Sequence, residues 1–221
     1  MKADRYNLFN FIHKALRAQL YDTALTLQKT DFTIETETET AIEKVQQTLK
    51  SFESHAEKEN HFILPAISKF DKQKALMIEG EHDTDEALSE QMKNKMEALR
   101  FAPVEQKDRT GRQLFYLFIE FTGFNLIHMN KEEHILNEIL WENYSEEELM
   151  AITAEIMKSI PPSEMMEIFP WMMKGITNLE LIGFLADLEK GLPTETFDAV
   201  MNMAHRTIPE RLNFKSASEA L

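Results

Sequence analysis

Apolar residues recur at every third or fourth position through most of residues 4–141, the spacing that places them on one face of an α-helix. Glycine and proline, which interrupt helices, number only six and seven among 221 residues. The pattern forms four long stretches: 4–30, from about 36 toward Pro65, 72–100 and 107–141. Four long helices joined by short connections are typical of an antiparallel, up-down four-helix bundle. We therefore predict an all-α protein whose first domain, residues 1–144, is such a bundle.

After residue 144 the pattern changes to short pieces separated by proline and glycine. Two capping boxes of the form S/T-x-x-E each open a helix in this region: Ser145 with Glu148, and Thr177 with Glu180. We predict a second domain, 145–221, with three or four short helices over 145–208 and a frayed tail over 209–221. Four methionines are expected to pack in the core rather than form an adaptable partner-binding face: Met165, Met166, Met172 and Met173.

Composition excludes several classes of function. The formal net charge of −14 argues against nucleic acid or an anionic membrane as a partner, because both bind through clusters of Lys and Arg. The absence of cysteine excludes disulfides, iron–sulfur clusters and thiol catalysis. The longest apolar run, 114–119, is far shorter than the ~20 residues of a membrane helix, and the N-terminus has no apolar signal segment. We predict a soluble, cytoplasmic protein.

The histidines carry the strongest pattern. Four of them are followed by glutamate four residues later, one helical turn away: His55/Glu59, His82/Glu86, His128/Glu132 and His134/Glu138. Residues 55–61 and 128–134 share the repeat HxxKExH. Each copy is preceded by a further histidine, His13 at 42 residues before the first copy and His82 at 46 residues before the second. The chain therefore looks like a duplicated helical hairpin.

Helix lengths predict that four histidines lie at one level. From His13 to the first turn and back to His55, the two arms are about 17 and 18 residues, or roughly 26 Å each at ~1.5 Å per residue. The arms between Glu59 and His82 are about 11 residues each, and those between His82 and His128 are about 19 each. Three separate turns thus return these histidines to one layer.

Apolar neighbours at helical spacing place these side chains on the inner faces of their helices. A buried layer of four histidines and two glutamates is costly without a partner. A metal resolves this cost, and four nitrogen and two oxygen ligands suit two first-row metal ions bridged by carboxylates better than one structural zinc ion. The candidate ligands are His13, His55, Glu59, His82, His128 and Glu132.

These six residues, in this order on four helices, resemble the ligand set of the hemerythrin-like, or HHE cation-binding, domain family. The resemblance spans about residues 5–142 and extends to the Leu-Pro-Ala sequence at 64–66 and to Glu81 before His82. The segment 169–175 is also similar to an extension in some larger members. An all-α, hemerythrin-like bundle is the fold that this resemblance implies.

The resemblance further implies a non-haem di-iron centre held by four to five histidines, with Glu59 and Glu132 bridging the iron ions beside an oxo or hydroxo bridge. Manganese suits the same ligand types. Oxygen-carrying members have another histidine one turn after the third-helix histidine, where this chain has Glu86. Members that repair iron centres usually carry a cysteine-bearing N-terminal segment, and this chain has no cysteine. Oxygen carriage and membership of the repair group are therefore not expected, and Glu86 stays open between a site and a surface position.

Three other histidines fit the pattern less well. His61 and His134 lie about 120° around their helices from the ligand face, and we expect them to be partly exposed and to pair with Glu57 and Glu138. The alternative for both is a supporting role beside the metal. His205 has no HxxxE pair and is expected to be an ordinary residue.

These features predict a protein that binds, senses or reduces a small ligand, namely O2, NO or peroxide, at a metal centre. Whether it is an enzyme stays open, and no catalytic triad, phosphate loop or nucleotide motif competes with the metal site. The alternative is an iron- or oxygen-responsive regulatory protein whose helices at 145–208 report the state of the site to a protein partner or to a second copy of the chain. A metal-free helical scaffold is the third possibility.

Overall fold

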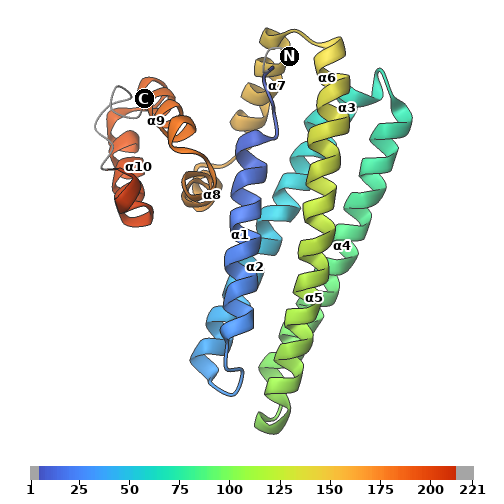
Figure 1. Ribbon diagram of the computed structural model, residues 1–221, viewed down its shortest axis with the longest axis vertical. Coiled ribbons are helices and arrows are strands. Elements are labelled where there is room, and N and C mark those ends of the chain that lie inside the picture. The colour runs from blue at the N-terminus through green and yellow to red at the C-terminus, as the bar shows by residue number, and fades with distance from the viewer. Residues whose placement is uncertain (1–4, 213–221) are drawn as a thin grey trace. The chain divides into compact units, whose positions relative to one another are not determined.

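The computed structural model describes residues 5–212, and every regular element in this range is helical, which confirms the prediction of an all-α protein. Two elements, η1 (Glu59–Ile63) and η2 (Glu132–Leu136), are π-helical turns, and η3 (Pro209–Arg211) is a 3₁₀ turn. The α-helices, labelled in Figure 1, are α1 (Asn10–Lys29), α2 (Glu35–Lys58), α3 (Leu64–Ser68), α4 (Lys72–Phe101), α5 (Val104–Lys131), α6 (Asn137–Asn143), α7 (Glu146–Ser159), α8 (Pro162–Gly175), α9 (Asn178–Gly191) and α10 (Thr194–Thr207).

The first helix begins later than the sequence pattern predicts. The expected start is residue 4, whereas α1 begins at Asn10. Arg5 is held by residues far along the chain: its guanidinium donates to the backbone oxygens of Trp141 and Tyr144 and to the carboxylate of Glu146. These hydrogen bonds tie the segment before α1 to the end of α6, so that it does not extend the helix.

Two long helical stretches contain a π-helical turn, and each turn begins at the glutamate of an HxxxE pair. The first stretch runs from α2 through η1 into α3, and the second from α5 through η2 into α6. A π-helical turn inserts one extra residue into a continuing helix and is frequent at functional sites. The chain therefore stays helical past Pro65, which lies in the first turn of α3, where a missing N–H is tolerated.

The described chain forms two compact units. The first unit combines the segment up to Asn10 with Gln19–Ser159, and the second combines Phe11–Ala18 with the chain from Ile160 onward. By these contacts α7 groups with the first unit. A domain boundary after residue 144 stays a prediction.

Within the first unit, α4 packs along α5, α2 packs against α4, and α3 packs against α4 and α6. The ribbons of α4 and α5 lie side by side and join at one end through the short turn at 102–103, so these two helices run antiparallel (Figure 1). Gly111 of α5 is required by a close approach, because a Cβ atom there would lie 2.1 Å from the ring of Phe32. The up-down arrangement of four long helices stays a prediction.

The second unit has its own apolar core, formed largely by α8, α9 and α10. Met173 is fully buried, Met165 and Met172 pack against this core, and Met166 is 37% exposed. Both predicted capping boxes are present, with reciprocal hydrogen bonds between Ser145 and Glu148 and between Thr177 and Glu180. Of the tail predicted over 209–221, residues 213–221 lie outside the described range. No helix within residues 5–212 has the length and apolar character that crossing a membrane requires.

Candidate metal centre

The six predicted ligands stand on the long helices and at the start of both π-helical turns. Their elements are α1 for His13, α2 for His55, η1 for Glu59, α4 for His82, α5 for His128 and η2 for Glu132. None of these side chains is more than 8% exposed. Their ligand atoms form two groups, and within each group the atoms lie within 4.8 Å of one another: His13, His55, Glu59 and Glu132 in one, and Glu59, His82, His128 and Glu132 in the other. Both glutamates belong to both groups.

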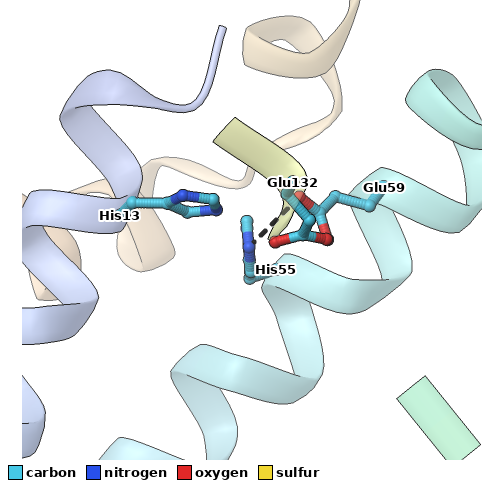
Figure 2. Close-up of side chains that lie close together, drawn as sticks. All are labelled: His13, His55, Glu59 and Glu132. Carbon is cyan, nitrogen blue, oxygen red and sulfur yellow. Dashed lines mark ion pairs between the residues drawn. The ribbon is translucent and has the colours of Figure 1, made fainter. Parts of the chain in front are cut away.

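Figure 2 shows the first group. The imidazole rings of His13 and His55 and the carboxylates of Glu59 and Glu132 point toward a common centre. These four side chains come from sequence positions up to 119 residues apart, since the first is at 13 and the last at 132. The second group lies entirely within the first compact unit.

The two carboxylates face histidines of different helices. Glu59 Oε1 lies 3.3 Å from His55 Nε2, and Glu59 Oε2 lies 3.2 Å from His82 Nε2. Glu132 Oε1 lies 3.1 Å from His128 Nε2 and 3.7 Å from His82 Nε2. The two oxygens of Glu59 therefore face histidines of two different helices, α2 and α4.

The outer nitrogens of two rings are fixed by hydrogen bonds. His82 Nδ1 lies 2.8 Å from Asn60 Oδ1, and His128 Nδ1 lies 2.8 Å from Glu81 Oε2. Amide and carboxylate oxygens only accept hydrogen bonds, so in both rings Nδ1 donates the proton. Both Nε2 atoms are thereby left to face the shared carboxylates, which is the tautomer that a metal ligand needs.

Burial and the neighbouring carboxylates shift the pKa values of two buried histidines in opposite directions. Burial lowers the pKa of His82, but the carboxylates of Glu132 and Glu59 outweigh burial and raise this pKa to about 10. The same opposition, with Glu132 as the main partner, raises the pKa of His128. Burial also disfavours ionisation of Glu81, but hydrogen bonds from Lys131 and His128 prevail and lower its pKa. The site therefore has a strong affinity for positive charge.

The donor set fits a metal ion. His82 Nε2 is buried, and its nearest carboxylate oxygens are those of Glu59 at 3.2 Å and Glu132 at 3.7 Å. A nitrogen lone pair and a carboxylate oxygen repel each other across 3.2 Å unless a cation, either a proton or a metal ion, stands between them. Imidazole nitrogen and carboxylate oxygen are common ligands of first-row transition metals. These buried groups could therefore hold metal ions.

The remaining predicted candidates lie on the surface. Glu86 is exposed, as are His61, His134 and His205. His134 Nδ1 lies 2.6 Å from the backbone oxygen of Asn130, and the ring of His61 packs edge-on against Phe62. The predicted pairing of these two histidines with glutamates is therefore not what the structure shows.

Some residues around the site are not found by sequence reasoning. Asn60 supports His82 from a position directly after Glu59, and Asp85 is buried where Glu86 is exposed. The signal for Asn60 is its place in the first HxxxE repeat. No sequence motif marks Asp85, because its burial depends on contacts with another helix, such as the one from Asn125 of α5.

Comparisons with protein-family models, curated proteins and solved structures give no significant match to the chain.

Proposed function

We propose that this chain is a hemerythrin-like protein whose long helices form an up-down four-helix bundle around a non-haem di-iron centre. The observation that carries the proposal is the sharing of Glu59 and Glu132 between two buried histidine pairs, His13 with His55 and His82 with His128. Each metal ion would receive two imidazole nitrogens and one oxygen from each glutamate. Two such positions that share their carboxylates constitute a dinuclear centre.

The proposed metal is iron, with manganese as the alternative that suits the same donors. The bound metal pair supplies Lewis acidity and, with iron, redox chemistry toward O2, NO or peroxide. Four protein donors per ion leave room for an oxo or hydroxo bridge and a small ligand. Two divalent ions outweigh the charge of two carboxylates before any bridge is counted, so an anionic bridging or terminal ligand would be favoured.

Neighbouring protein residues orient the candidate ligands. Asn60 and Glu81 fix the tautomers of His82 and His128. The ring of Phe124 lies nearly parallel to the ring of His128 at a centroid distance of 6.0 Å, so an apolar side chain borders this part of the site. We propose that the protein binds, senses or reduces a small diatomic ligand or peroxide at this protected site, in the cytoplasm.

Metal analysis of chain expressed with iron tests the proposal. We expect about two metal ions per chain in the wild type and less than one in the double variant His55→Ala, His128→Ala. His134→Ala is the matched control, because His134 stands in the same repeat as His128 but is exposed. Fewer than about one metal ion per chain in the wild type, or unchanged metal content in the double variant, would contradict the di-iron proposal.

The alternative, a regulatory protein that responds to iron or oxygen, is favoured by one observation in the second unit. The α1 segment that contains His13 groups with α8, α9 and α10. On this segment Lys14 pairs with Glu180 at 2.5 Å, and Phe11 packs edge-on against Phe184. Metal-dependent protection of residues 160–212 from hydrogen exchange would favour this alternative. Rapid consumption of peroxide or NO by the iron-loaded protein would instead favour a protein that reduces a small ligand at the metal centre.

A further inference from the structure

Asp85 is a buried carboxyl group that the proposed ligand set does not use. It stands on α4, three residues after His82, and is 7% exposed. Asn125 of α5 donates from Nδ2 to Asp85 Oδ1 at 2.5 Å. The same Nδ2 donates to the backbone oxygen of Phe121 at 3.2 Å, and since a carbonyl can only accept, this bond fixes the orientation of the amide. Asn125 therefore holds Asp85 in a defined position.

Helix direction places Asp85 on the other side of the histidine layer from Glu132. Because α4 and α5 run antiparallel, a step forward along one is a step backward along the other (Figure 1). Glu132 follows His128 by four residues and Asp85 follows His82 by three, so they are displaced in opposite directions by roughly 6 and 4.5 Å at ~1.5 Å per residue. Side chains tilt toward the N-terminus of their helix, so both carboxyl groups lean back toward the histidines.

In the proposed bundle, Glu132 would approach the metal positions from one side of the histidine layer, which would leave the opposite side for a ligand that the protein does not supply. Asp85 lies on that side, next to the helix turn that carries His82. We infer that Asp85, held by Asn125, donates a hydrogen bond to the small exogenous ligand of this site. The inference rests on the proposed metal centre. The ligand class is a small anion or oxygen species with an accepting atom, such as azide, peroxide or O2.

The surroundings of Asp85 favour a proton-bearing carboxyl group. Burial raises the pKa of Asp85, and Glu53 adds to this rise, while the bond from Asn125 and the nearby His128 and His82 act against it. A protonated carboxyl group donates a hydrogen bond, whereas an ionised one would repel an anion. For packing alone an apolar residue would serve this helix interface without the desolvation cost of a carboxyl group.

Azide titration of the iron-loaded protein tests this inference, with metal content measured on every sample. The probe is sodium azide, followed by its charge-transfer absorption and by the infrared stretch of bound azide, which responds to hydrogen bonding. The variants are Asp85→Leu, which removes the donor, and Asp85→Asn, whose amide N–H can still donate. Glu86→Gln is the control, since Glu86 is the adjacent but exposed residue.

We expect Asp85→Leu to keep its metal and to bind azide about 10-fold to 100-fold more weakly, the range for a hydrogen bond to a charged group. Asp85→Asn should stay within about threefold of the wild type, and Glu86→Gln should match it. Wild-type azide affinity and an unchanged infrared stretch in Asp85→Leu would overturn the inference. Loss of metal from both Asp85 variants would make this residue a ligand and overturn it as well. A wild type that binds no metal would instead refute the proposed function on which the inference rests.

Discussion

Glu81 Oε2 lies 2.8 Å from His128 Nδ1, on the side of the ring that faces away from the shared carboxylates. The other oxygen of Glu81 lies 2.5 Å from Lys131 Nζ, so the carboxylate is kept ionised while it orients the ring. His82 has the neutral amide of Asn60 in the corresponding place. The two histidines of this group therefore differ in the charge of their outer partner.

Removal of the Glu81 carboxylate should weaken metal binding. Loss of such an outer partner lowers metal affinity by about 10-fold to 100-fold, and we expect Glu81→Ala to lower it by that factor. Glu81→Gln should lower the metal affinity less, because its amide oxygen can still accept a hydrogen bond from His128. Competition with a metal chelator measures the loss. Glu79→Gln, an exposed position on the same helix, should behave like the wild type. Equal affinity of Glu81→Ala and Glu79→Gln would show that His128 needs no outer support.

Replacement of a shared carboxylate should affect both metal positions. Glu59 is 1% exposed and faces His55 with one oxygen and His82 with the other. Glu59→Gln removes the charge that both positions would share, and we expect the metal content to fall from about two ions per chain to one or fewer. Glu57→Gln, two residues earlier and exposed, should keep both ions. Two tightly held ions in Glu59→Gln would exclude a bridging role.

Metal-free protein should lose stability as the pH rises above neutrality. The folded-state pKa of His82 is raised from 6.5 to about 10, so its stabilising effect is complete below about pH 6.5 and is lost as the pH rises through 10. Thermal unfolding from pH 7 to 10 should show a steeper fall for metal-free wild type than for His82→Gln. Metal-loaded protein should not show this loss of stability between pH 7 and 10, because the metal takes the place of the proton on His82. Parallel curves for metal-free wild type and variant would contradict the charged, carboxylate-paired state of His82.

Two glycines of α5 should respond oppositely to alanine. At Gly111 an added Cβ would lie 2.1 Å from the buried ring of Phe32, so Gly111→Ala should destabilise the protein by about 1–3 kcal/mol. At Gly123 nothing lies within 4 Å of the added atom, and alanine there should stabilise the helix by roughly 0.5–1 kcal/mol. Chemical denaturation of both variants measures this difference. A Gly111→Ala protein as stable as Gly123→Ala would contradict the packing at Phe32.

The helices were predictable because their apolar spacing is local and long. The prediction of an all-α chain and both capping boxes are confirmed, since these signals depend on residues three or four positions apart. The start of α1 was predicted wrongly, because it depends on hydrogen bonds from Arg5 to residues near 141–146. The π-helical turns also had no local signal, although both begin at an HxxxE glutamate.

For the candidate site, repeated spacing was enough to select residues that the structure places in two buried groups. Equal helix arms bring histidines on different helices to one level, and this can be counted from the sequence. Helix lengths do not identify the residues that surround the ligands, such as Asp85. Asp85 and Glu86 differ by one position, and only the orientation of α4 against α5 determines that Asp85 is the buried one.

The most direct test of the metal centre is anomalous X-ray scattering from crystals of the iron-loaded chain. A dinuclear centre would give two anomalous peaks, one beside His13 and His55 and one beside His82 and His128, with Glu59 and Glu132 contacting both. The same crystals would show whether oxygen atoms of each glutamate are divided between the two ions. A single peak, or peaks away from these six residues, would contradict the proposed dinuclear centre.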